Sequence, residues 1–356
     1  MATPTRDNNF DLLRLIAAIQ IAVYHCYEHL HFSSPVVNSV LYATRFFIGI
    51  PVLFTISGFL IFFSYERAPN LKTYFRNRFL RIYPGLWVCL LFTILLLIMF
   101  GHLNWSGAST LPFWSWLITQ LTFLQFYTPE LFRHFGTGTP NGSLWTIPVE
   151  IGFYIFIPLM LRFTGKKMGS RNLHLIVWTI FSIAFNIWYQ QYKFSDSPSN
   201  LSKLPGVTVA PYLFYFLFGA LAANNWERIK MWYEGKGLVW LTVYVLYSIL
   251  FCVLLKKYEI GYWTNAYHLL SILLLSQSVI SLAYTYKSVG QKLTGGNDYS
   301  LGIYLYHMPV INVILVLGLA GSNLSLLYVT LIVGILAFLS WKYIEQPPLA
   351  SRQNRM

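Results

Sequence analysis

The chain has 356 residues, of which 56% are hydrophobic, 18% are aromatic and only 10% are charged. Soluble domains carry about 25% charged residues, so this composition excludes an ordinary pair of soluble domains and indicates a membrane protein with many crossings. The net charge of +13 is explained by basic cytoplasmic loops, and we therefore expect no nucleic-acid partner. Apolar segments run from end to end, which predicts a single membrane domain over residues 1–356.

A helix needs about 20 apolar residues to cross the hydrocarbon core of a bilayer. Ten such runs predict an all-α fold with about ten transmembrane helices, at residues 10–28, 45–64, 82–101, 143–162, 173–191, 208–225, 238–256, 263–285, 299–319 and 324–343. The run 112–127 is too short and rich in tryptophan, so we predict an interfacial or re-entrant segment there.

The lysines and arginines between these runs predict the orientation. If the N-terminus is cytoplasmic, 18 of the 25 basic residues lie in cytoplasmic segments and 6 lie in outer segments. Lysine and arginine accumulate on the cytoplasmic side of membrane proteins. The count therefore predicts that both termini are cytoplasmic and that the protein is a multi-pass component of the cytoplasmic membrane.

The first run is apolar enough to span a bilayer, yet it carries Asp11, Arg14 and His25. Ionisable groups at membrane depth are costly and are functional candidates by default. Arg14 and His25 are eleven residues apart, so on a helix they share a face and lie about 16 Å apart. Asp11 precedes Arg14 by one turn and is placed to neutralise it.

The fourth run carries a carboxylate, Glu150, among apolar residues. Counting helix rise places His25 roughly 22 Å above the cytoplasmic surface and Glu150 roughly 10 Å below the outer surface, at a similar depth. Such a pair suits a general base and the acid that orients it. A structural His–Glu pair that joins two helices is the alternative. Pro148 is expected to free a backbone carbonyl one turn earlier and to open the helix there.

Aromatic residues accompany this carboxylate. Tyr154 follows Glu150 by one turn and Trp145 precedes it, and both are candidate pocket residues. Trp145, Trp105 and Trp116 are candidates for stacking on sugar rings. An aromatic belt at the membrane surface is the alternative.

A pair of arginines, Arg78 and Arg81, shares a helix face at the cytoplasmic start of the third run. The guanidinium fork matches phosphate geometry, so the pair is a candidate site for a phosphorylated cytosolic ligand. Simple anchoring by positive charge is the alternative. In the second run, Gly58 permits close approach of another helix, and the neighbouring Ser57 is a further candidate pocket residue.

The ninth run contains His307, which lies about 12 Å from the cytoplasmic side and three residues after Tyr304. It is a candidate pocket residue, and a polar group for helix packing is the alternative. His25, His29 and His31 lack a closing ligand nearby, so no metal is expected.

These segments together resemble the acyltransferase type-three family of integral membrane acyltransferases. The matching motifs follow in the family's order from residue 9 to 348: FDLLRLIAAIQIAVYH with Arg14 and His25, SGFLI at 57–61, FRNRFLRIYP with Arg78 and Arg81, SLWTIPVEIGFYIFIP around Glu150, YSLGIYLYHMPV around His307, and WKYIEQPP. The order of the whole set makes the resemblance specific.

The resemblance implies transfer of an acyl group, usually acetyl, from cytosolic acyl-CoA to a hydroxyl of a glycan or lipid-linked carbohydrate. It implies that Arg14 and His25 are essential and that Arg78 and Arg81 help to hold the donor, acetyl-CoA. We expect Arg14 to share in donor binding and His25 and Glu150 to be catalytic. We also expect a stand-alone enzyme without the C-terminal esterase-like domain of many members. A transporter or flippase without acyl chemistry is the alternative.

Overall fold

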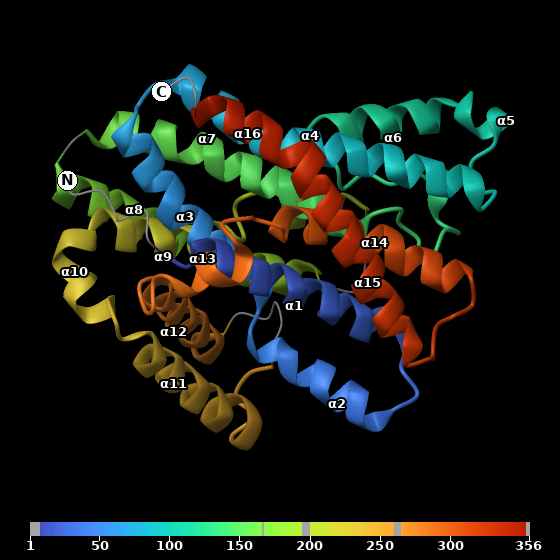
Figure 1. Cartoon of the computed structure of the whole chain (residues 1–356). Helices are drawn as coiled ribbons and strands as arrows, with labels where there is room; N and C mark the ends of the chain where they lie inside the picture. Colours follow the sequence, from blue (N-terminus) through green and yellow to red (C-terminus); the bar gives the residue numbers. More distant parts are fainter. Residues whose placement is uncertain (1–7, 166, 194–199, 260–264, 354–356) are drawn as a thin grey trace. The chain divides into compact units, whose positions relative to one another are not determined.

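A computed structural model describes residues 8–165, 167–193, 200–259 and 265–353. Within these ranges the regular structure is helical, from α1 to α16, and no strand occurs (Figure 1). The prediction of an all-α fold is therefore confirmed.

The α-helices vary widely in length. They are α1 (Phe10–Leu30), α2 (Pro35–Ala43), α3 (Gly49–Arg67), α4 (Leu71–Met99), α5 (Trp105–Ala108), α6 (Leu111–Leu121), α7 (Thr146–Thr164), α8 (Met168–Lys193), α9 (Leu213–Asn224), α10 (Trp226–Tyr233), α11 (Gly237–Ser248), α12 (Ala266–Ala283), α13 (Val289–Thr294), α14 (Ser300–Val316), α15 (Leu324–Ser340) and α16 (Gln346–Gln353). A π-helical segment, Ile249–Leu254, extends α11, and another, Trp341–Glu345, joins α15 to α16.

In the described part of the chain, eight helical runs are long and apolar enough to cross a membrane, which confirms a polytopic membrane protein. They correspond to eight of the ten predicted runs. The other two, at 208–225 and 299–319, form the shorter apolar helices α9 and α14. The 12 residues of α9 extend only about 18 Å, less than the roughly 30 Å of a hydrocarbon core.

The short α9 has a local cause. The chain before it forms a 3₁₀ segment, Asn200–Val207, and then turns as far as Tyr212. Pro211 lies in these turns, and because proline has no backbone N–H it cannot donate a helical hydrogen bond. The predicted run 208–225 is therefore helical only from Leu213 onward.

Two further helix starts differ from the sequence predictions. The helix α4 begins at Leu71 rather than at residue 82, so the basic stretch around Arg78 is part of the helix. The helix α7 begins at Thr146, so Pro148 lies in its first turn. Backbone N–H groups in a first turn have no intrahelical acceptor, and proline costs nothing there. The expected opening of the helix by Pro148 is therefore wrong.

Two compact units make up the chain, and α1, α4 and α7 contribute to both. Unit 1 comprises the described residues of 1–17, 46–75 and 149–297, and unit 2 comprises those of 18–45, 76–148 and 298–356.

In unit 1, α3 and α9 cross with their backbones in contact. A Cβ atom added to Gly58 would lie 1.8 Å from the carbonyl oxygen of Phe216, and one added to Gly219 would lie 2.0 Å from that of Thr55. The Thr55 hydroxyl also donates a hydrogen bond to the carbonyl of Tyr215 at 3.1 Å. The close helix approach predicted at Gly58 is thus confirmed.

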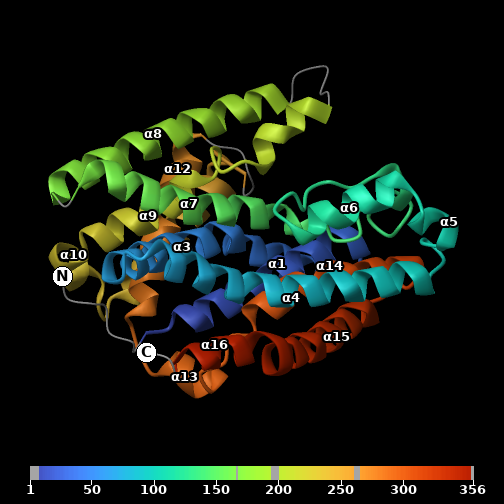
Figure 2. The same ribbon diagram turned by 90° about the horizontal axis from the view of Figure 1, so that it is seen from above.

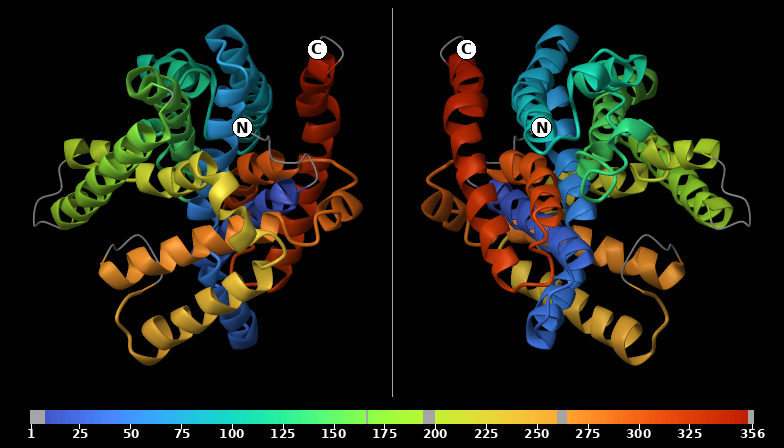
Figure 3. Two further views of the ribbon diagram at one scale, coloured as in Figure 1. Left: turned by 90° about the vertical axis from the view of Figure 1, so that its left-hand side faces the viewer. Right: turned by 90° about the vertical axis from the view of Figure 1, so that its right-hand side faces the viewer.

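The other helices of unit 1 pack around this crossing. The helix α8 lies beside α9 (Figure 2). It supports the start of α9, since the Ser182 hydroxyl accepts a hydrogen bond from the Phe214 N–H at 2.9 Å. The same hydroxyl donates to the carbonyl of Ala210 at 2.6 Å. The helices α11 and α12 run side by side, in yellow and orange in Figure 3.

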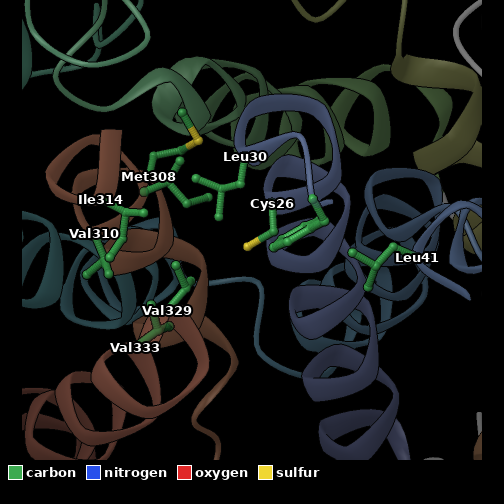
Figure 4. Close-up of a cluster of buried hydrophobic side chains, with 10 residues drawn as sticks. Cys26, Leu30, Leu41, Met308, Val310, Ile314, Val329 and Val333 are labelled. Carbon is green, nitrogen blue, oxygen red and sulfur yellow. The ribbon is translucent and has the colours of Figure 1, made fainter. Parts of the chain in front are cut away.

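In unit 2, a hydrophobic core joins the last turns of α1 to α2, α14 and α15 (Figure 4). Its buried members are Cys26, Leu30, Phe32, Leu41, Met308, Val310, Ile311, Ile314, Val329 and Val333. The helices α14 and α15 also approach closely, because a Cβ added to Gly302 would lie 2.7 Å from the Cα of Ala337. This core holds the C-terminal half of α1 against α14.

The crossing of α3 and α9 predicts the effect of a single methyl group. Gly58→Ala places a Cβ 1.8 Å from Phe216 O, and overpacking of this kind costs about 1–3 kcal/mol. We expect a lower melting temperature for the purified protein in detergent. Gly169→Ala is the matched control, because its added Cβ meets no atom within 4 Å. Equal melting temperatures for both variants would contradict the close crossing.

Candidate active site

The polar face predicted for α1 begins with an ion pair. Arg14 Nη1 lies 3.2 Å from Asp11 Oδ1, which confirms that Asp11 neutralises Arg14. The Arg14 side chain is only 13% exposed, whereas that of Asp11 is 57% exposed. Arg14 belongs to unit 1, and His25, eleven residues later on the same helix, belongs to unit 2.

Within unit 2, His25 is half-buried and lies in a stack of three imidazoles. Its ring centroid is 5.2 Å from that of His307 on α14, with the ring planes 26° apart. His29, one turn later on α1, also stacks on His25 at 5.8 Å with an interplanar angle of 1°. The structure therefore brings together two predicted site residues from opposite ends of the chain.

The depths predicted for His25 and His307 do not agree with this contact, because stacked rings lie at the same level. The prediction counted helix rise from a start of α14 at the membrane surface. In the structure that start is itself buried, since Asp298 and Ser300 are each 6% exposed.

The buried histidine of α14 is held in one orientation. His307 Nδ1 lies 3.1 Å from the carbonyl oxygen of Ile303. A carbonyl only accepts hydrogen bonds, so Nδ1 carries the proton of the neutral ring and Nε2 has a lone pair. This Nε2 is buried and has no hydrogen-bond partner in the described part of the chain. It is therefore an available base or nucleophile beside His25.

A belt of polar contacts joins α14 to the segment before α7. The Tyr304 hydroxyl donates to the carbonyl of Ser143 at 2.6 Å and lies 2.5 Å from the Thr146 hydroxyl. Asn141 Nδ2 donates to the carbonyl of Leu305 at 2.8 Å. Nothing in the sequence indicated that this segment anchors the helix carrying His307.

The carboxylate of Glu150 belongs to unit 1, where it accepts a hydrogen bond from the hydroxyl of Tyr154 one turn later. Tyr154 is buried and Glu150 is half-buried. The pairing of Glu150 with His25 stays a prediction. The contact with Tyr154 follows from the four-residue spacing alone.

The other candidate pocket residues have different surroundings. Ser57 is buried in α3 next to the glycine of the α9 crossing. Trp145 is half-buried in unit 2, and Trp105 is 88% exposed. Trp116 is 2% exposed and packs on Phe132 with ring centroids 4.7 Å apart. Trp116 is therefore a core residue of unit 2, and its suggested stacking on a sugar ring is wrong.

The arginine pair of α4 has an acidic partner that the sequence analysis missed. Arg81 Nη2 lies 2.7 Å from Asp298 Oδ2, and the Asp298 side chain is 7% exposed. Arg78 lies one turn before Arg81 on the same helix. A second missed acid, Glu345, is 3% exposed, interacts electrostatically with Arg81 and Asp298, and accepts a hydrogen bond from the hydroxyl of Ser340 at 2.6 Å.

Glu345 was visible in the sequence as the acid of the WKYIEQPP motif, two residues after the predicted tenth run. The signal for Asp298 was weaker, because it lies just outside the predicted ninth run. Across the described residues, no group of three or more histidine, cysteine, aspartate or glutamate side chains could hold a metal ion.

The fold and these buried ionisable groups define a polytopic helical membrane protein with a polar site built among its helices. Residues 7–343 match the acyltransferase domain that characterises the type-three family. The match covers nearly the whole chain, and the protein therefore belongs to this family of membrane acyltransferases.

Named relatives support the same assignment. The chain is 31% identical to nodulation protein 10 of Rhizobium leguminosarum bv. viciae, over 98% of this chain and 94% of that protein. It is 27% identical to the O-acetyl transferase of Shigella phage Sf6, over 96% of each. It is 24% identical to the peptidoglycan O-acetyltransferase OatA of Listeria monocytogenes, over 95% of this chain and 55% of that protein. No solved structure matches the chain.

The contact between Arg81 and Asp298 predicts a stability effect. Arg81→Gln removes a positive charge from a buried carboxylate, and we expect the free energy of unfolding to fall by about 1–2 kcal/mol. The double variant Arg81→Gln/Asp298→Asn removes both charges and should recover part of that loss in a thermal unfolding assay. Arg76→Gln, at an exposed position of the same helix, is the control and should unfold like the native chain. Native stability in Arg81→Gln would mean that the pair contributes nothing.

Proposed function

We propose that this protein transfers an acetyl group from cytosolic acetyl-CoA to a hydroxyl of a surface or lipid-linked carbohydrate. Membership of the acyltransferase family supports the reaction, and relatives named O-acetyl transferase and peptidoglycan O-acetyltransferase support acetyl as the group and a glycan as the acceptor. In this proposal residues 1–356 act as one acyltransferase domain in the cytoplasmic membrane, with both termini on the side that supplies acetyl-CoA.

The observation that carries the proposal is the stacking of His25 on His307 inside unit 2. Transfer to a hydroxyl needs a base that accepts its proton and a place where water does not compete for the acyl group. A neutral imidazole with a free ring nitrogen, held among apolar helices, meets both needs. Two such imidazoles in contact allow one ring to react with the acyl group and the other to handle the proton.

In a direct transfer, the imidazole of His25 accepts the proton of the acceptor hydroxyl while its oxygen attacks the thioester carbonyl. The carbon–sulfur bond then breaks, and the departing thiolate of CoA takes up that proton. In a relay, a nitrogen of His25 attacks the thioester first and CoA leaves as the thiolate. The acceptor hydroxyl then attacks the acetyl-imidazole, His307 Nε2 takes the hydroxyl proton, and that proton is passed on to the thiolate.

Arginines are the proposed contacts for the phosphates of the donor. We assign this role to Arg14, Arg78 and Arg81. The ion pair with Asp298 engages Nη2 of Arg81, and the planar guanidinium fork matches the geometry of phosphate oxygens. The Asp298 carboxylate holds the Arg81 guanidinium in one orientation.

Glu150 is the proposed acid that orients His25 or stabilises its cation. The hydrogen bond from Tyr154 holds the Glu150 carboxylate in one position, which supports a role in orientation. We also keep Ser57, Trp145 and Tyr154 as residues of the acceptor pocket. Trp145 precedes α7 in the segment that Thr146 and Tyr304 attach to α14, so it is held near the helix of His307.

The first test is complementation of a deletion strain. We expect Arg14→Ala and His25→Ala to abolish O-acetylation of the surface glycan while the protein level holds, measured by mass spectrometry and NMR of that glycan. His134→Ala removes an exposed histidine and serves as the control, with native acetylation expected. Full activity in either site variant would overturn the assignment. Glycans of unchanged mass on deletion of the gene would instead favour a transporter or flippase.

The second test separates the relay from direct transfer. With radiolabelled acetyl-CoA and no acceptor, the relay predicts labelled protein in the native chain and none in His25→Ala. It also predicts that His307→Ala accumulates label while turnover falls by about 10²–10⁴, because the base of the second step is missing. Unlabelled protein in both, together with normal native turnover, would exclude the relay. A labelled His25→Ala chain would place the acetyl group on another residue.

A further inference from the structure

A groove of about 780 Å³ lies in unit 1, formed by the end of α3, the start of α4 and the end of α7. None of the residues assigned to acyl transfer lines it. Its lining combines basic side chains at one end, Arg67, Arg162 and Arg171, with an apolar wall that includes Phe75 and Leu159. A cavity with this lining matches an amphiphilic ligand, which has a charged part and an apolar part.

The three arginines of the groove are not equivalent. Arg171 is buried and lies 2.8 Å from Glu66, and its Nε donates to the carbonyl of Gly165 at 2.9 Å. These contacts neutralise Glu66 and complete the end of α7, so Arg171 has a structural role. Arg67 and Arg162 are exposed and make no hydrogen bond or ion pair with any other described residue. Their two charges are therefore available to an anion.

The start of α4 adds a third positive element to the same end of the groove. Pro69 and Leu71 line the groove, and Asn70 Oδ1 accepts a hydrogen bond from the N–H of Thr73 at 2.9 Å, as an N-terminal cap does. The N-terminus of a helix carries a partial positive charge that favours anions. The Tyr74 hydroxyl donates to the carbonyl of Tyr154 on α7 at 3.1 Å, so this end of α4 is fixed beside α7.

The apolar wall extends from the basic end along both helices. Leu71 and Phe75 on α4 are 49% and 39% exposed, and Ile155 and Leu159 on α7 are 45% and 51% exposed. From Arg162 back to Ile155 the helix rises about 10 Å. Apolar side chains exposed over this length on membrane-spanning helices suit an acyl chain that lies in the groove.

We propose that this groove binds an anionic phospholipid of the cytoplasmic leaflet. Its phosphate contacts Arg67, Arg162 and the start of α4, and an acyl chain follows the wall toward Ile155. The distribution of basic residues predicts the cytoplasmic side for these arginines, and anionic lipids concentrate in that leaflet. CoA also carries negatively charged phosphates, but it has no long acyl chain that would lie along the apolar wall. The groove therefore fits a phospholipid better than CoA.

The test measures lipid binding by the full-length protein without acetyl-CoA, so its result does not depend on the proposed acetyl transfer. Purified protein in a neutral detergent is titrated with phosphatidylglycerol or phosphatidylcholine, and bound lipid is counted by native mass spectrometry. We expect the native chain to prefer phosphatidylglycerol and Arg67→Gln/Arg162→Gln to bind it roughly 25-fold more weakly, with about fivefold from each arginine. Lys236→Gln/Lys292→Gln loses the same charge from exposed positions of unit 1 outside the groove and should bind like the native chain.

Two further measurements distinguish a lipid site from a site for free phosphate or for CoA. Leu159→Gln retains both arginines and interrupts the wall, and it should also weaken phosphatidylglycerol binding, whereas a site for free phosphate would not respond. An excess of CoA should leave the bound lipid in place, and its displacement would mean that the groove binds the donor instead. Gel filtration confirms folded protein for each variant. Equal binding by the arginine variant and the lysine control would overturn the proposal.

Discussion

A polar side chain inside a membrane protein has no water around it, so it needs a partner within the protein. The buried charges of this chain follow that constraint within each unit. In unit 2 the carboxylate of Asp298 meets Arg81 at 2.7 Å, and in unit 1 the guanidinium of Arg171 meets Glu66 at 2.8 Å. The Nε2 atom of His307 is among the few buried side-chain atoms for which the described part of the chain provides no hydrogen-bond partner. Leaving such an atom without a hydrogen bond costs about 1–3 kcal/mol. A buried polar group without a partner is therefore a candidate for a functional role.

The position of that nitrogen depends on close packing elsewhere. His307 stacks on His25 only because the buried core of α1, α2, α14 and α15 holds α1 against α14. The contact of Gly302 with Ala337 draws α14 and α15 together, and the polar belt around Tyr304 attaches the segment before α7. In a bilayer, where apolar side chains gain little from leaving lipid, small residues and interhelical hydrogen bonds determine which helices associate. The stacking of His25 on His307 is therefore a consequence of how α1 and α14 are packed.

Hydropathy and charge predicted most of the helices because they indicate whether a segment can lie in lipid or needs contact with water. They carry no information on pairing, so the contact between His25 and His307 could not be read from them, although both residues were candidates. The same limit hid Asp298, the partner of Arg81. Counting helix rise gave His25 and His307 different depths although their rings are in contact, and hydropathy overestimated the length of α9, which Pro211 precedes. Local spacing was the reliable guide, as the contacts of Asp11 with Arg14 and of Glu150 with Tyr154 demonstrate.

Arginine illustrates why contacts, and not residue type, separate structural roles from binding roles here. Counted along the sequence, Arg81, Arg162 and Arg171 all contribute alike to the excess of positive charge on the predicted cytoplasmic side. In three dimensions Arg171 pairs with Glu66 and with the carbonyl after α7, and Arg81 is oriented by Asp298. Arg162 lines a groove and has no carboxylate partner among the described residues. A buried and fully paired guanidinium stabilises the fold, an oriented one can recognise a phosphate with defined geometry, and an exposed one beside an apolar wall suits a lipid headgroup. Arginines that look alike in the sequence can therefore serve lipid binding in unit 1 and recognition of a phosphorylated donor in unit 2.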